Sequence, residues 1–132
     1  MKHEELIKKA IEVRDNAYAP YSNFQVGCAI LLKDGQVYTG ANVENASYGL
    51  SNCAERSAFF AAYSDGYRQD DVKALAIVAD TESFCSPCGA CRQVIHELVN
   101  EDTEIILTNL NGITKVLNRD EVLPFSFGRN DL

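Results

Sequence analysis

Three cysteines in two short motifs place the strongest constraint on how this chain folds. Cys53 stands first in a C-A-E motif, and Cys88 and Cys91 stand in a P-C-G-A-C motif further along the chain. Zinc takes sulfur ligands in a tetrahedral arrangement, and a catalytic zinc keeps one position for water, so three cysteines suit a catalytic site. Glu55, at the start of a helix, is then placed to move protons without binding the metal. The fold is expected to bring these two distant segments together.

This order of ligands and one free carboxylate is the layout of zinc-dependent base deaminases, and it favours a hydrolytic deaminase. Two other interpretations remain open. A structural zinc knuckle would take Cys85 as a fourth ligand beside the other three cysteines and would leave no position for water. A thioredoxin-like redox pair would account for Cys88 and Cys91, but it explains neither Cys53 nor Glu55.

The composition indicates a single domain spanning residues 1–132. With 46% hydrophobic residues, a chain of this size buries a core without disulfide bonds. Its 19 acidic and 12 basic residues give a net charge of -7, which disfavours nucleic acid and anionic membranes as partners and favours a small substrate that is not polyanionic. The five cysteines are an odd number and no N-terminal apolar stretch is typical of a signal peptide, so we expect reduced thiols and a cytoplasmic location.

The periodicity of the apolar residues predicts an α/β protein in which helices pack on a mixed sheet. Pro20 is expected to end the first helix, and the pairs Asp34-Gly35 and Asn111-Gly112 indicate hairpin turns. The predicted helices are roughly His3–Tyr18, Ala54–Tyr63, Gly89–Leu98 and a short one that is capped by Asn118 and runs to Leu123. The predicted strands are Gln25–Leu32, Gln36–Ala41, Ala74–Ala79, Glu104–Leu107 and Ile113–Leu117.

The charge of the metal site needs compensation, because three thiolates and Zn²⁺ together carry one net negative charge. Helix N-termini at Cys53 and Cys88 would supply unpaired backbone N–H groups and the positive end of the helix dipole. Arg56 is a second candidate, since its guanidinium group can donate a hydrogen bond to a ligating sulfur and so tune the metal. The alternative for Arg56 is a surface ion pair of little energetic value. His96 lies about 140° around its helix from Cys91 and is expected to face elsewhere.

Six motifs follow one another along the chain. They are Tyr18-Ala19-Pro20-Tyr21-Ser22-Asn23-Phe24-Gln25-Val26-Gly27, Asn42-Val43-Glu44-Asn45-Ala46, Cys53-Ala54-Glu55-Arg56, Ser86-Pro87-Cys88-Gly89-Ala90-Cys91-Arg92-Gln93, Leu123-Pro124 and Ser126-Phe127-Gly128. With these motifs in this order, the chain resembles the small cytidine deaminases over almost its whole length. The resemblance implies a three-layer α-β-α fold with a mixed five-stranded sheet. It also implies a homotetramer that holds one zinc ion per subunit.

The resemblance implies roles for individual residues. Zinc would be held by Cys53, Cys88 and Cys91, with proton transfer by Glu55. At the base, Phe24 would lie beside the pyrimidine, the backbone N–H of Ala54 would contact the base carbonyl, and the carbonyl of Ser86 would contact the departing amine. At the sugar, Asn42 and Glu44 would bind the ribose hydroxyl groups, with Val43 between them. Neighbouring subunits would complete each pocket with Ala46, Tyr48 and Phe127. Phe125 and Cys85 depart from the family pattern, and we assign them no function.

The predicted reaction is hydrolytic deamination of cytidine, and of 2′-deoxycytidine, to uridine or deoxyuridine and ammonia, as a step of pyrimidine salvage. Glu55 would take a proton from the zinc-bound water as hydroxide attacks C4, and would then protonate ring N3. A zinc deaminase of another aminated heterocycle or nucleoside analogue is the first alternative. A structural zinc module that only binds, with four sulfurs on the metal and no turnover, is the second.

Overall fold

A mixed five-stranded sheet organises the chain, and the computed structural model describes all of residues 1–132. The strands are β1 (Val26–Leu32), β2 (Val37–Ala41), β3 (Val72–Ala79), β4 (Glu104–Asn109) and β5 (Thr114–Leu117), in the order β2-β1-β3-β4-β5. Only β3 and β4 run parallel, while the other neighbours are antiparallel. The predicted mixed sheet is confirmed.

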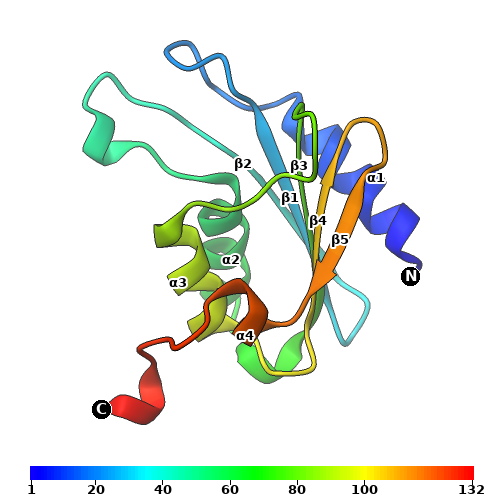
Figure 1. Ribbon diagram of the computed structural model, residues 1–132, viewed down its shortest axis with the longest axis vertical. Coiled ribbons are helices and arrows are strands. Elements are labelled where there is room, and N and C mark those ends of the chain that lie inside the picture. The colour runs from blue at the N-terminus through cyan, green and yellow to red at the C-terminus, as the bar shows by residue number, and fades with distance from the viewer.

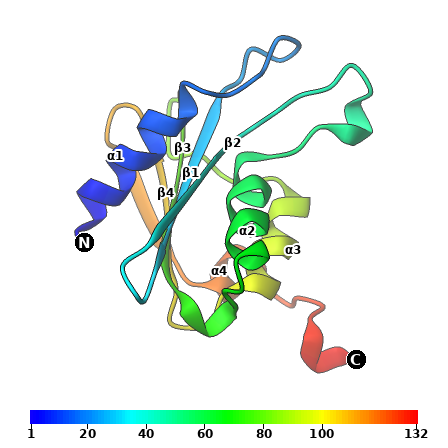
Figure 2. The same ribbon diagram turned by 180° about the vertical axis from the view of Figure 1, so that it is seen from behind.

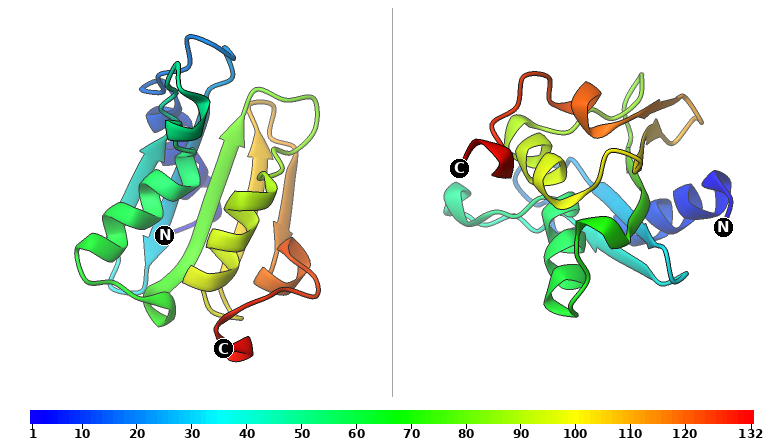
Figure 3. Two further views of the ribbon diagram at one scale, coloured as in Figure 1. Left: turned by 90° about the vertical axis from the view of Figure 1, so that its left-hand side faces the viewer. Right: turned by 90° about the horizontal axis from the view of Figure 1, so that it is seen from below.

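Helices cover both faces of the sheet and complete the expected three-layer α-β-α arrangement (Figure 1). The helices are α1 (His3–Arg14), α2 (Ala54–Ser64), α3 (Gly89–Leu98) and the short α4 (Arg119–Val122). Seen from behind, α1 lies on one side of the sheet, and α2 and α3 lie on the other (Figure 2). The left view of Figure 3 shows α2 and α3 side by side in front of the strands. No helix is both long and apolar enough to cross a membrane.

The apolar run of β1 is explained by its burial on both faces. Ile30 and Leu32 belong to the larger core cluster, on the side of α2 and α3. Ala29 and Leu31 alternate with them and belong to the smaller cluster, against Leu6 and other residues of α1. Strands that are buried on both faces are apolar at every position instead of alternating, so β1 and β3 form the rigid centre on which the helices are placed.

The first helix ends earlier than the sequence predicts. It stops at Arg14, and Tyr18 lies in extended backbone beside Val43. The backbone N–H of Tyr18 donates to the Asn42 carbonyl at 2.9 Å, and the N–H of Glu44 donates to the Tyr18 carbonyl at 2.8 Å. The prediction of a helix to residue 18 was wrong. The backbone groups of Tyr18 pair with a distant segment instead of with a further helical turn, so the helix ends before it reaches Pro20.

The other boundaries lie close to the predicted ones. Helix α3 matches its predicted span, and α4 has Asn118 as its cap, whose side chain accepts from the Glu121 N–H at 2.9 Å. Strand β3 starts at Val72, two residues before the prediction, because Val72 pairs with Leu32 of β1. The larger helices therefore start where the sequence places them, and this fixes the geometry of the site.

Candidate active site

The three cysteines meet where two helices begin. Cys53 is the N-cap of α2, Cys88 is the N-cap of α3, and Cys91 lies in the first turn of α3. Their ligand atoms all lie within 4.8 Å of one another. Two helix N-termini thus direct unpaired N–H groups and positive dipole ends toward the same cluster of sulfurs, which favours their thiolate forms.

This cluster fits a zinc ion. Sulfurs bound tetrahedrally at about 2.3 Å lie about 3.8 Å apart, a spacing that the observed cluster reaches with small movements. Cys85 is buried but does not belong to the cluster, so the geometry offers three sulfurs and not the closed four-sulfur knuckle. A fourth position is then left for a water molecule, as in catalytic zinc sites.

Arg56 contacts the cluster directly. Its Nη2 donates a hydrogen bond to Cys53 Sγ at 3.1 Å, which is the contact that the sequence analysis considered for this residue. Hydrogen bonds from the Cys91 thiol and from Arg56 lower the pKa of Cys53 to about 5. The pKa of Cys91 is raised, because its thiol is the donor to Cys53 and is also removed from water. In the metal-free protein Cys53 therefore gives up its proton first, and metal binding must displace the proton of Cys91.

Glu55 lies in the first turn of α2, next to the cluster. Only 4% of the residue is exposed. Burial raises the pKa of its carboxyl group above the ordinary value, since the charged form loses its hydration. A carboxyl group with a raised pKa exchanges protons more readily near neutral pH, which suits an acid and base in catalysis.

One cavity of about 250 Å³ joins Cys53, Cys88 and Glu55 to four of the nine residues expected at the substrate, which are Phe24, Asn42, Ala54 and Ser86. It is lined by Phe24, Val26, Asn42, Cys53, Ala54, Glu55, Cys85, Ser86, Pro87 and Cys88. Val26 and Pro87 were not predicted as part of the site, although both belong to motifs noted in the sequence. Cys85, to which we assigned no function, contributes to the wall, and burial raises the pKa of its thiol to about 11.

Asn42 holds the loop that carries Phe24. Its Oδ1 accepts from the Val26 N–H at 2.8 Å, and its Nδ2 donates to the Phe24 carbonyl at 2.8 Å. One N–H and one oxygen lone pair of the amide remain free for other partners. Asn42 thus shapes the cavity wall and keeps polar groups that a substrate can use.

Glu44 lines a different hollow, of about 350 Å³. The hollow is lined by Tyr21, Ser22, Glu44, Tyr48 and Ser51. The rings of Tyr21 and Tyr48 meet edge to face with their centroids 6.3 Å apart. The two residues expected at the ribose, Asn42 and Glu44, therefore line two different hollows and not a single wall.

The remaining predicted residues lie outside the cavity of their own chain. Val43 is 51% exposed, and its backbone pairs with Asn52. Ala46 is exposed, Tyr48 is 76% exposed and Phe127 is 61% exposed. Large apolar side chains on the surface are typical of interfaces, and this chain alone does not bring Ala46 or Phe127 to the cysteines.

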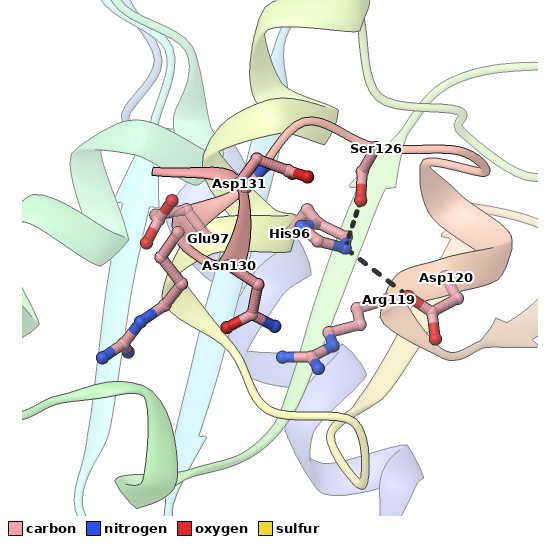
Figure 4. A pocket seen from close by; sticks show the side chains of 9 residues that line it. His96, Glu97, Arg119, Asp120, Ser126, Asn130 and Asp131 are labelled. Atoms are coloured by element: carbon pink, nitrogen blue, oxygen red, sulfur yellow. Dashed lines mark hydrogen bonds and ion pairs between the residues drawn. The ribbon is translucent and has the colours of Figure 1, made fainter.

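A second cavity, of about 260 Å³, lies under the C-terminal tail and is shown in Figure 4. His96 Nε2 lies 2.8 Å from Ser126 Oγ and 3.5 Å from Asp120 Oδ1. Gln93 Nε2 donates to the Phe127 carbonyl at 2.9 Å. As predicted, His96 faces away from the cysteines, and it contacts the tail. The side chains around this cavity anchor the tail, and none of them belongs to the cysteine cluster.

Comparisons with known proteins agree with this site. A family model described as the cytidine and deoxycytidylate deaminase zinc-binding region matches residues 1–109. The cytidine deaminase of Halalkalibacterium halodurans is 55% identical over 132 residues, which cover 100% of this chain and 98% of that protein. The probable cytidine deaminase of Dictyostelium discoideum is 39% identical over 135 residues, with 98% of this chain and 89% of that protein covered.

Solved structures show the same fold. The crystal structure of cytidine deaminase from Burkholderia pseudomallei has a TM-score of 0.93 and 50% identity, covering 96% of this chain and all of that chain. Cytidine deaminase from Mycobacterium tuberculosis has a TM-score of 0.81 and 39% identity, covering 97% of this chain and 98% of that one. On the family match, the full-length similarity and the cysteine cluster together, the chain belongs to the cytidine and deoxycytidylate deaminase family.

Proposed function

We propose that this protein hydrolytically deaminates cytidine, and also 2′-deoxycytidine, to the corresponding uridine and ammonia. The observation that carries the proposal is the buried carboxyl group of Glu55, which lines one cavity together with Cys53 and Cys88. A metal site and a proton carrier on the same wall are what attack by water on an aminated ring requires. Relatives that match the chain over its full length are named cytidine deaminases, which supports this choice of substrate.

Cys53, Cys88 and Cys91 would hold the zinc ion. When bound, zinc lowers the pKa of a water molecule and so supplies a nucleophile at neutral pH. Glu55 accepts the proton of the attacking water and delivers it to ring N3, and it then carries the proton of the hydroxyl group added at C4 to the departing amine, which leaves as ammonia. Because burial raises the pKa of Glu55, the carboxyl group retains the proton between these steps.

The cavity and the hollow at Glu44 together offer a partner for each polar group of the nucleoside. Ala54 is the first residue of α2, and its backbone N–H has no partner within the helix, so it is free to donate to the base carbonyl. The carbonyl of Ser86 accepts from the exocyclic amine, and the ring of Phe24 packs on the base. Asn42 and Glu44 bind the sugar hydroxyl groups, and their neighbour Val43 holds the connecting backbone in place.

The assembly that we propose is a homotetramer in which neighbours complete each pocket. The cavity of about 250 Å³ is smaller than the roughly 300 to 1,000 Å³ that is typical of small-molecule sites. Exposed Tyr48 and Phe127, with Ala46, are the side chains available to close it from another subunit. We further propose a role in pyrimidine salvage in the cytoplasm, where a reducing environment keeps the three clustered cysteines free to bind metal.

The test follows the ultraviolet spectrum of cytidine in the presence of the zinc-loaded protein. Wild type should convert the cytidine spectrum to that of uridine, and Glu55→Gln should not, although it retains zinc. The exposed Glu12→Gln serves as a matched control and should match wild type. Faster loss of free cytosine than of cytidine would point to another aminated ring. Equal zinc content with no turnover of any such ring would leave only a structural zinc module.

A further inference from the structure

Ser22 connects two residues that the proposed function assigns to the substrate. Its hydroxyl group donates a hydrogen bond to Oε2 of Glu44. The Ser22 Oγ itself accepts the backbone N–H of Phe24 at 3.0 Å. A serine hydroxyl has one hydrogen to donate, and because the Phe24 N–H already occupies a lone pair, that hydrogen is the group directed at the carboxylate. The Phe24 N–H therefore helps to direct the Ser22 hydroxyl hydrogen toward Glu44.

The other oxygen of Glu44 is also occupied. Oε1 accepts the backbone N–H groups of Tyr21 at 3.0 Å and of Ser22 at 3.1 Å. A carboxylate accepts about four hydrogen bonds, so with three donors from the protein one acceptor position remains, and it lies on Oε2. The hydrogen bonds from the hydroxyl and the backbone of Ser22 lower the pKa of Glu44, which keeps the group ionised.

We propose that Ser22 is a positioning residue, whose hydroxyl group orients the Glu44 carboxylate so that Oε2 accepts one sugar hydroxyl of the nucleoside. This assignment rests on the proposed function, because it needs a nucleoside at Glu44. Within the protein, the Ser22 hydroxyl is the one group that holds Oε2, whereas Oε1 is held by two backbone donors. Loss of the hydroxyl would leave Glu44 attached through one oxygen and free to turn the other away from the sugar.

The experiment compares two substrates that differ only in the sugar hydroxyl groups that the proposed function assigns to Asn42 and Glu44. Values of kcat/KM are measured for cytidine and for 2′,3′-dideoxycytidine, which lacks both ring hydroxyl groups, with wild type, Ser22→Ala and Ser22→Thr. Ser22→Ala should lower kcat/KM for cytidine about fivefold, through KM and not kcat, the effect of one net hydrogen bond. The loss for the dideoxy analogue should be smaller than about twofold, and Ser22→Thr, which keeps a hydroxyl group, should recover most of the activity toward cytidine.

Two further variants separate positioning from a general effect on the fold. Ser64→Ala removes an exposed hydroxyl that donates to the Phe60 carbonyl at 2.6 Å, at the far end of α2, and should leave both substrates unaffected. In a Glu44→Gln background, Ser22→Ala should cause little further loss, because the two residues act as a unit. Equal losses on both substrates, or no loss on cytidine, would overturn the assignment. Wild type that leaves cytidine unchanged would overturn the proposed function, and the role of Ser22 with it.

Discussion

At the scale of single residues, Arg56 is the side chain whose effect on the metal is most directly testable. Its hydrogen bond to Cys53 Sγ draws charge away from a ligand. Groups that hydrogen-bond to metal ligands typically change metal affinity or activity by roughly 10- to 100-fold when removed. We expect Arg56→Ala to keep the fold and to lose zinc affinity or turnover by an amount in this range.

The measurement combines zinc competition with a chromophoric chelator, turnover of cytidine and circular dichroism. Arg68→Ala is the matched control, because Arg68 donates to the carbonyls of Tyr63 and Tyr67 and has no contact with the cysteines. Unchanged zinc affinity together with unchanged turnover in Arg56→Ala would show that the contact is only structural.

A second residue pair gives a pH dependence away from the metal. Tyr67 Oη donates to Asp34 Oδ2 at 2.6 Å, which lowers the pKa of Asp34 and raises that of Tyr67 to about 12. Because the pKa of Asp34 is lower in the folded state, its stabilisation is complete above the unfolded value of about 3.9 and is lost as the pH falls through the folded value. Because the pKa of Tyr67 is raised in the folded state, its contribution to stability is complete below the unfolded pKa of about 10 and is lost as the pH rises through the folded pKa of about 12.

Tyr67→Phe should therefore have a lower Tm than wild type at pH 7, and the difference should shrink in acid. Thermal melts of both proteins across the range from about pH 7 to 3 provide the comparison. Metal loss in acid affects both proteins alike and cancels in the difference. A Tm difference that stays constant over this range would contradict the coupling.

At the scale of elements, the C-terminal tail depends on α3. The tail contacts α3 through the pair His96–Ser126 (Figure 4) and through the pair Gln93–Phe127. His96 Nδ1 has no partner, and Nε2 makes the hydrogen bond to Ser126 and a longer contact with Asp120 of α4. The ring of His96 therefore gives the tail one hydrogen bond. We expect His96→Leu to release the tail while the helix stays packed.

Limited proteolysis followed by mass spectrometry tests this prediction. Cleavage within residues 125–132 should become several times faster in His96→Leu, because the local opening free energy falls by about one hydrogen bond, ~1 kcal/mol. His3→Leu, which removes the other histidine and its contact with Glu104, should cleave like wild type. Equal rates for all three proteins would show that other contacts hold the tail.

The elements also show what the sequence contains and what it lacks. Helix α3 was predicted over its full span, and the angle of about 140° between Cys91 and His96 on that helix correctly placed His96 away from the cysteines. The end of α1 was misplaced because pairing of Tyr18 with Val43 is a long-range contact, and periodicity reports only local order.

The substrate side was harder to predict than the metal side. Metal ligands are recognised by residue type and spacing, so the grouping of the cysteines was accessible. The hydrogen bonds from Ser22 to Glu44 join two loops whose approach depends on the whole sheet, and a serine in a loop is too common to stand out. The same applies to Val26, whose place in the cavity wall depends on which face of β1 the helices cover.

At the scale of the whole molecule, a zinc ion would link α2 to α3, which come from distant parts of the chain. A ligand that binds only the folded protein stabilises it by about 4 kcal/mol when its free concentration is a thousand times Kd. Removal of zinc with a chelator should therefore lower Tm by several degrees, and added zinc should restore it. Cys91→Ser should reduce this shift, and a control variant Cys28→Ala, at a buried cysteine that does not belong to the cluster, should retain it. A Tm independent of zinc in wild type would contradict the link.

The ligand cluster and the sugar-facing loops are supported by different parts of the fold. Sulfurs are held by helix starts that pack on the central strands, whereas Glu44 is held by hydrogen bonds between two surface loops. We therefore expect changes at Glu44 and Ser22 to disturb the metal geometry less than changes at the helix starts. Such a division allows selection, in nature or in a library, to explore new sugars and analogues one loop at a time while the reactive centre is inherited unchanged.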